Sequence, residues 1–208
     1  MAEFTRDVAV AAAALRRGAL VAYPTETFYG LGALATLPEA LSRLASAKLR
    51  PEGKPLPLAT FDAESAFALW REVLPLARRL AQAFWPGPLT LVAAAAAGLP
   101  PEVSVGGSVG VRVPGLALAR ELARLAGGAI VSTSANPSGG ASPVSVADLA
   151  PGFLSRIDLV LDGGTTPGGL PSTVVEVGPS GAKLLRAGAV SWAQVQGALR
   201  APLPSRDG

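Results

Sequence analysis

The segment Val21–Gly32, which reads Val-Ala-Tyr-Pro-Thr-Glu-Thr-Phe-Tyr-Gly-Leu-Gly, constrains the fold more than any other part of the chain. An apolar run from Ala19 ends at Tyr23-Pro24, because proline cannot donate to a sheet ladder. Small polar side chains and two glycines, which allow close approach to the backbone, follow at once. Open α/β sheets place ligands at strand ends of this kind. Taken alone, the segment also fits an ordinary strand-to-helix turn capped by Thr25 or Thr27.

Strand-like and helix-like segments alternate along the chain, which predicts an α/β fold. The strands predicted over 172–177 and 182–186 can form a hairpin, because a Gly-Pro-Ser-Gly turn joins them. Early crossovers favour parallel pairs and this hairpin favours an antiparallel one. We therefore expect a single domain over residues 1–200, with a twisted mixed parallel/antiparallel sheet flanked by helices. The tail 201–208 is expected to be loose.

The composition excludes several kinds of chemistry. The 208 residues include no cysteine and no histidine. Without cysteine there is no disulfide framework, thiolate nucleophile or thiolate metal site. Without histidine, imidazole serves neither as a base nor as a metal ligand. Catalysis would depend on lysine, arginine, carboxylates, hydroxyls, backbone amides or a metal ion carried on phosphates, and we predict no metal site held by the protein itself.

Charge and hydropathy favour a soluble protein with an anionic ligand. The chain has 18 Lys and Arg against 15 Asp and Glu, a net charge of +3. This excess is too small to indicate a nucleic-acid partner by itself. The longest apolar run, Leu89–Gly98, is too short to span a bilayer. An N-terminus with Glu3, Arg6 and Asp7 is not typical of a secretory signal. We expect a cytoplasmic protein without membrane contact.

The densest cluster of cations is Lys48-Leu-Arg50-Pro-Glu-Gly-Lys-Pro55. Its prolines and glycine disfavour a helix, so we expect an extended or looped backbone. Alternate side chains of an extended chain point the same way, which would place Lys48 and Arg50 roughly 6–7 Å apart. That spacing suits two oxygens of one polyphosphate. A solvated basic loop is the alternative for this segment.

A second apolar run ends in small polar groups at Ser132-Thr-Ser-Ala-Asn136. Such groups bind carboxylates, hydroxyls or ribose well, although Ser/Asn-rich turns are also common. An unpaired guanidinium within a strand would be costly. Arg112 therefore either meets a structural carboxylate or binds an anionic ligand. Arg186 stands at the end of a later strand and can reach the same face, and hydroxyls recur at the strand boundary over 168–173.

Two nucleotide-binding motifs are missing from the chain. There is neither a G-x-x-x-x-G-K-[ST] loop nor a G-x-G-x-x-G fingerprint. A bound nucleotide would therefore be held by scattered cations and hydroxyls rather than by a glycine-rich cradle.

With these segments in order, the chain resembles the YrdC/TsaC family, the threonylcarbamoyl-AMP synthases. The matches are specific because they keep the family order over nearly the whole chain. Its length is similar to that of the short, single-domain form, and the resemblance implies a YrdC-like fold with a deep basic cavity. The matching segments are Tyr23–Gly32, Lys48-Leu-Arg50, Lys54-Pro-Leu56, Trp85–Thr90, Val111–Pro114, Ser132–Asn136, Pro171-Ser-Thr173 and Leu185–Gly188.

The resemblance implies a nucleotidyltransferase that makes threonylcarbamoyl-AMP and pyrophosphate from L-threonine, bicarbonate or CO₂, and ATP. Mg²⁺ would be carried mainly by the ATP phosphates. The product would pass to the tRNA threonylcarbamoyl transferase machinery, which modifies the adenosine beside the anticodon. A double-stranded RNA- or tRNA-binding module of the same fold, without synthase activity, is the alternative. The carbamoyl-transfer domain of hydrogenase maturation proteins is a third reading, ranked last because the cysteines of its zinc finger are absent.

The resemblance also implies roles for individual residues. Lys48 and Arg50 correspond to the catalytic cations. The threonine-binding set is Thr25, Arg112, Ser132 and Ser172. The set that faces ATP is Lys48, Arg50, Ser108, Ser134, Asn136, Ser142 and Arg186.

One departure and two loops complete these expectations. Many relatives place a histidine near the position of Ala59, and this chain has none. Threonine contacts there must then be weaker or come from other groups. Because carbamates decompose in water, we expect a mobile loop over the cavity, either 50–55 or 137–143.

Overall fold

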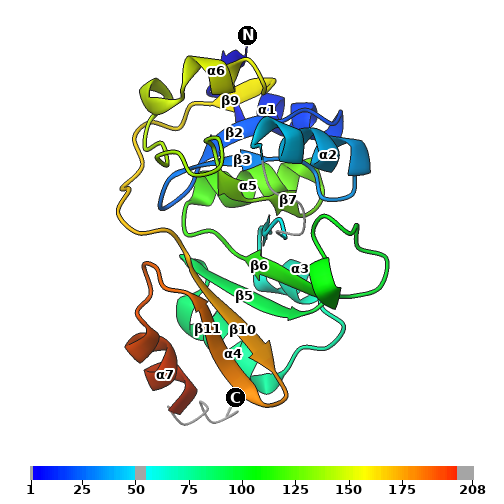
Figure 1. Ribbon diagram of the computed structural model, residues 1–208, viewed down its shortest axis with the longest axis vertical. Coiled ribbons are helices and arrows are strands. Elements are labelled where there is room, and N and C mark those ends of the chain that lie inside the picture. The colour runs from blue at the N-terminus through cyan, green and yellow to red at the C-terminus, as the bar shows by residue number, and fades with distance from the viewer. Residues whose placement is uncertain (1, 50–54, 201–208) are drawn as a thin grey trace.

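The computed structural model describes residues 2–49 and 55–200 (Figure 1). Within these ranges the strands form two sheets, which we call the first and the second sheet. Along the first sheet the order is β1 (Glu3–Thr5), β9 (Leu159–Leu161), β2 (Val21–Pro24), β3 (Tyr29–Gly32) and β8 (Thr133–Ser134). Along the second it is β11 (Gly181–Arg186), β10 (Thr173–Gly178), β5 (Leu89–Ala94), β6 (Ser108–Arg112), β4 (Leu58–Ala59) and β7 (Ile130–Val131).

Both sheets mix parallel and antiparallel pairs. In the first sheet β1, β9 and β2 are parallel, whereas β3 pairs antiparallel with β2 and β8. In the second sheet β10 is parallel to β5 and antiparallel to β11. The mixed α/β class and the β10–β11 hairpin are thus confirmed. The strands are divided between two sheets rather than gathered in one.

The chain changes sheets at Ser132. β7 belongs to the second sheet and ends at Val131, while β8 belongs to the first and begins at Thr133. The amide of Ser132 donates to the carbonyl of Pro57 at 2.8 Å, and that of Val131 donates to Ala33 at 2.8 Å. A single residue therefore separates the two sheets along the chain. The sequence pattern predicts a strand over 129–132 but does not predict β8.

The segment after Tyr23-Pro24 is a hairpin turn, not a strand-to-helix turn. Residues 25–28 join β2 to the antiparallel β3, a strand that the sequence pattern did not predict. The two glycines of β3 do allow close approach, as expected. The ring of Tyr23 lies against both, and a Cβ built on Gly32 would come 2.9 Å from its Cε1 atom.

Helices cover the outer faces of both sheets (Figure 1). Ala11 and Leu15 of α1 (Val8–Arg16) and Leu122 of α5 (Ala117–Ala126) form one core cluster with β2 and β9. Leu41 of α2 (Pro38–Ala47) and Phe153 of α6 (Pro151–Leu154) belong to the larger core cluster. The second sheet packs against α3 (Ala63–Phe67), α4 (Pro75–Phe84) and α7 (Trp192–Arg200).

Alternation along the second sheet separates a core face from an open face. Leu89, Leu91, Val109, Val111 and Val175 are fully buried in the core. Because side chains alternate between the faces of a sheet, the residues between them point the other way. That opposite face forms the floor of the cavity described below.

No helix in the described ranges combines the length and the apolar character needed to cross a bilayer. The predicted loose tail 201–208 lies outside these ranges, and the extent of the domain stays a prediction.

We predict that Gly32→Ala lowers the free energy of unfolding by about 1–3 kcal/mol, because the new methyl group would overlap the buried Tyr23 ring. Urea denaturation measures the change. Gly197→Ala is the control: no atom lies within 4 Å of its built Cβ in α7, so it should be neutral or slightly stabilising. Equal midpoints for both variants would contradict the packing described for Tyr23.

Candidate functional site

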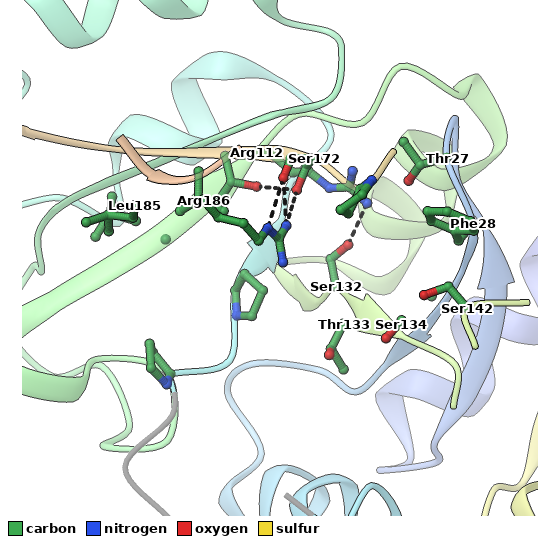
Figure 2. Close-up of a pocket in the computed structure, with 18 of the residues that line it drawn as sticks. Thr27, Phe28, Arg112, Ser132, Thr133, Ser134, Ser142, Ser172, Leu185 and Arg186 are labelled. Carbon is green, nitrogen blue, oxygen red and sulfur yellow. Dashed lines mark hydrogen bonds between the residues drawn. The ribbon is translucent and has the colours of Figure 1, made fainter. Parts of the chain in front are cut away.

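A cavity of about 1080 Å³ is lined by residues from both sheets (Figure 2). This volume is at the upper end of the range for small-molecule sites, roughly 300–1,000 Å³. Every predicted site residue that the structure describes lies in its wall, while Arg50 falls outside the described residues. These wall residues are Thr25, Lys48, Ser108, Arg112, Ser132, Ser134, Asn136, Ser142, Ser172 and Arg186.

Arg112 is held between the two sheets. It ends β6, and its side chain is only 8% exposed. One guanidinium nitrogen donates to Glu26 Oε1 at 2.9 Å. Another donates to Ser132 Oγ at 2.9 Å (Figure 2). Of the two possibilities weighed for Arg112, the structure shows the structural carboxylate. A guanidinium has five N–H donors, so these two hydrogen bonds leave further donors of Arg112 for a ligand.

Glu26 was not among the predicted site residues. It lies in the β2–β3 turn, and its side chain is 16% exposed. A Cβ built on Gly115 would lie 3.2 Å from its Cγ, so the side chain is closely packed. Among the described residues its Oε2 is buried without a hydrogen-bond partner. Glu26 therefore acts through Arg112 rather than facing the cavity.

Arg186 and Ser172 form a second hydrogen-bonded group. Two nitrogens of Arg186 donate to the carbonyl of Ser172, at 2.7 and 3.2 Å, and one also donates to its hydroxyl at 3.0 Å. The same hydroxyl lies 3.0 Å from Thr90 Oγ1. Thr90 stands in a matching segment, yet the sequence alone did not mark it as part of the site. The network fixes the direction of Arg186 toward the cavity (Figure 2).

The two arginines create local positive charge. Within the described residues Arg186 forms no ion pair, whereas Arg112 is paired with Glu26. The pKa of Arg186 is lowered, mainly because its own guanidinium is partly buried and also because Arg112 is positively charged. A negatively charged ligand between them would relieve this repulsion. The site is therefore suited electrostatically to an anion.

The loop after β7 is tied to the end of α2 by Lys48. This residue is 2% exposed and caps the helix with helical backbone angles. Its ammonium group donates to the carbonyl of Asn136 at 2.8 Å and also to that of Ser134. The expectations of an extended backbone at Lys48 and of a solvated basic loop are both wrong for this residue. Burial against two carbonyls makes it part of the cavity wall.

Two further predicted residues shape the turns in which they stand. Thr25 Oγ1 donates to the carbonyl of Phe28 at 2.7 Å and accepts from the amide of Thr27 at 3.2 Å. The amide group of Asn136 donates to the carbonyl of Gly140, and among the described residues its Oδ1 is buried without a hydrogen-bond partner. Both side chains thus stabilise the backbone that carries the neighbouring hydroxyls.

The position at which many relatives are expected to have a histidine does not line the cavity. Ala59 is fully buried and pairs with Arg112 and Ile130 across β4. The loop 137–143, a lid candidate, contributes Ser138, Gly139 and Ser142 to the wall. The other candidate, 50–55, lies outside the described residues except for Pro55. Which loop closes the site stays a prediction.

A mixed α/β fold with two sheets and an arginine- and hydroxyl-lined cavity defines the structural class. A family model described as telomere recombination and named for Sua5, YciO and YrdC matches residues 13–188. The chain belongs to this Sua5/YciO/YrdC family.

Similar proteins extend over most of the chain. It is 42% identical over 181 residues to a threonylcarbamoyl-AMP synthase of Halorhodospira halophila, covering 85% of this chain and 92% of that protein. It is 39% identical over 191 residues to the one of Pyrococcus abyssi, covering 91% of this chain but only 56% of that protein. A structure of P. abyssi Sua5 complexed with L-threonine superposes with a TM-score of 0.89 at 36% identity, covering 95% of this chain and 60% of that one.

We predict that Glu26→Gln lowers the free energy of unfolding by about 1–3 kcal/mol, because it leaves the buried Arg112 charge without its partner. Chemical denaturation measures the change. Glu64→Gln is the matched control, since its ion pair with Arg78 spans 3.9 Å between exposed side chains. If both variants unfold at the same midpoint, the Arg112–Glu26 pair does not stabilise the fold.

Proposed function

We propose that this protein is a threonylcarbamoyl-AMP synthase, a nucleotidyltransferase. It converts L-threonine, bicarbonate and ATP into threonylcarbamoyl-AMP, pyrophosphate and water. The observation that carries this proposal is the placement of Arg112 and Arg186 in one hydroxyl-lined cavity, with Arg186 lacking an ion-pair partner among the described residues. Membership of the family and the names of the relatives support it.

In this proposal threonine occupies the part of the cavity around Arg112. The remaining donors of Arg112 bind the threonine carboxylate, and the hydroxyls of Thr25, Ser132 and Ser172 bind its polar groups. Ser132 and Ser172 are each already hydrogen-bonded to an arginine, which fixes their direction before a ligand arrives. The complex of P. abyssi Sua5 with L-threonine supports this choice of substrate.

ATP would occupy the rest of the cavity. Arg186 and Lys48 supply positive charge, together with Arg50, and the neutral wall groups are Ser108, Ser134, Asn136 and Ser142. The described residues contain no group of three or more carboxylates that could hold a metal ion. We propose that Mg²⁺ arrives as part of the nucleotide substrate, bound mainly by phosphate oxygens and water, as is usual for this ion.

The chemistry suits a chain without histidine. The amine of threonine and bicarbonate condense to a carbamate and water. A carbamate oxygen then attacks the α-phosphorus, the bond to the β-phosphate breaks, and pyrophosphate leaves. The nucleophile is already an anion, so the main task of the protein is to stabilise charge on the phosphates. Fixed guanidinium groups such as Arg186 perform that task without a base.

The product is a reactive mixed anhydride, so a consuming reaction must follow. We propose that the tRNA threonylcarbamoyl transferase machinery takes it up in the cytoplasm, and that tRNA itself is a candidate partner. A duplex RNA- or tRNA-binding module without synthase activity is the competing function. Its salt-dependent RNA binding would be accompanied by no pyrophosphate release.

We predict that the purified protein releases pyrophosphate from ATP only when threonine and bicarbonate are both present. A coupled pyrophosphate assay with each substrate supplied alone and together measures this. Release without threonine, or none under any combination, would refute the synthase. Serine in place of threonine tests the amino-acid preference in the same assay.

We predict that Arg186→Gln lowers kcat by about 10²–10³-fold, since one electrostatic stabiliser of the transition state is lost. Arg186→Lys retains the charge and should recover part of the rate. Arg186 is a cleaner test than Lys48, whose removal would disturb the backbone of Ser134 and Asn136. Arg124→Gln, which breaks an exposed pair on α5, is the control and should keep full activity. Wild-type rates in Arg186→Gln would remove it from the site.

A further inference from the structure

Glu176 is a carboxylate in a cavity otherwise suited to anions. It lies on β10 and is the one acidic side chain among the described residues of the wall. Within those residues it forms no ion pair and no hydrogen bond through its carboxylate. A carboxylate in this position would repel a triphosphate. Because Glu176 lies in the cavity proposed to bind ATP, its carboxylate must have a role other than binding phosphates.

The strand places Glu176 far from the residue that holds Arg186. Ser172, Val174 and Glu176 are every second residue, so their side chains point to the same face of the sheet. Four residues separate Glu176 from Ser172, which is about 13 Å along the strand. Ser172 is the residue that holds Arg186. The carboxylate of Glu176 and the guanidinium of Arg186 therefore stand at opposite ends of one face. A nucleotide lying along this face would meet opposite charges at its two ends.

The floor between the two ends is apolar and flat. Val174 pairs with Thr90, Glu176 pairs with Val92, and Val92 pairs with Gly110 in the neighbouring strands. A Cβ built on Gly110 would lie 3.3 Å from Val92 Cγ2, so a larger residue would crowd this floor. Val92, Gly110 and Val174 all line the cavity. An apolar, flat surface suits a planar base rather than a sugar or phosphates.

Ser108 and Glu176 form the outer end of this floor. Both also line a second groove of about 440 Å³, together with Glu72 and Lys183. The two residues thus stand where the cavity continues into the outer groove. Lys183 pairs with Glu176 across β10 and β11, yet the two side chains form no ion pair.

We propose that Glu176 selects adenine by accepting a hydrogen bond from its exocyclic amine. This inference rests on the proposed function. An ionised carboxylate accepts hydrogen bonds and donates none, whereas the hydroxyl of Ser108 can donate to a ring nitrogen beside that amine. Hypoxanthine carries a carbonyl oxygen in place of the amine, and Glu176 repels it. The same charge repels the triphosphate, so Glu176 also keeps the phosphates at the arginine end of the cavity.

The test compares ATP with ITP, whose base is hypoxanthine, in wild type, Glu176→Gln and Glu72→Gln. The readouts are kcat/KM for pyrophosphate release with threonine and bicarbonate, and nucleotide binding by calorimetry. Wild type should prefer ATP. Glu176→Gln should reduce the ATP-to-ITP ratio about tenfold, because an amide can also donate to the hypoxanthine carbonyl and a hydrogen bond to a charged group is lost. Glu72→Gln is the same chemical change in the outer groove only, and should keep the wild-type ratio.

2′-Deoxy-ATP separates the base from the ribose. The cost of removing the 2′-hydroxyl should be equal in wild type and Glu176→Gln. If Glu176→Gln changes this cost and leaves the ATP-to-ITP ratio unchanged, Glu176 reads the ribose and the proposal is overturned. An unchanged ratio with normal ATP- and threonine-dependent turnover overturns this inference alone. Wild-type protein that binds no ATP overturns the proposed function, and this inference with it.

Discussion

The buried pair between Arg112 and Glu26 is the interaction on which the site depends. Removing a guanidinium and a carboxylate from water costs several kcal/mol each, and this cost is offset only when the two groups meet with good geometry. Here they meet at 2.9 Å, and Ser132 accepts a further hydrogen bond. Arg112 belongs to the second sheet, and Glu26 lies in a turn of the first sheet. Ser132 is the residue at which the chain passes from the second sheet to the first. The pair therefore fixes the separation of the two sheets at the cavity.

The two arginines of the cavity differ in how their charges are balanced. Arg112 has a carboxylate partner, whereas Arg186 is oriented by the neutral groups of Ser172. A neutral acceptor directs a guanidinium without cancelling its charge. Arg186 therefore contributes positive charge to the cavity that no carboxylate of the described residues balances. Glu176 lies about 13 Å along the strand from Ser172, which holds the Arg186 guanidinium. The floor therefore has a polarity that an elongated ligand with one anionic end can match.

Local signals in the sequence were sufficient to mark several segments of the site, and the family resemblance supplied the others. Strand ends followed by hydroxyls marked Thr25 and Ser132, and all the described site residues indeed line one cavity. The sequence alone was not sufficient to predict which side chains of distant segments bind one another. The partner of Arg112 is 86 residues away, and the short apolar runs before Ser132 do not reveal to which sheet each belongs.

Errors at shorter range have a different cause. Lys48 was read together with the proline- and glycine-rich residues that follow it, yet it still belongs to the last turn of α2. The strand Tyr29–Gly32 was missed because its two glycines have low strand propensity. In the structure Gly32 is favoured for another reason, since a Cβ there would come 2.9 Å from the buried Tyr23 ring. In β3, packing against Tyr23 therefore outweighs the low strand propensity of glycine.

The absence of histidine is consistent with how the cavity is built. Ala59 is buried in the core and does not line the cavity. Polar contacts come instead from side chains whose directions are fixed before a ligand binds: Ser132 by Arg112, Ser172 by Arg186, and the 134–136 backbone by Lys48. Each pairs a cation with a hydroxyl or a carbonyl. Such preorganised dipoles and charges stabilise a developing anion without reorganising, and a reaction between a carbamate and a nucleotide needs that more than it needs a proton acceptor.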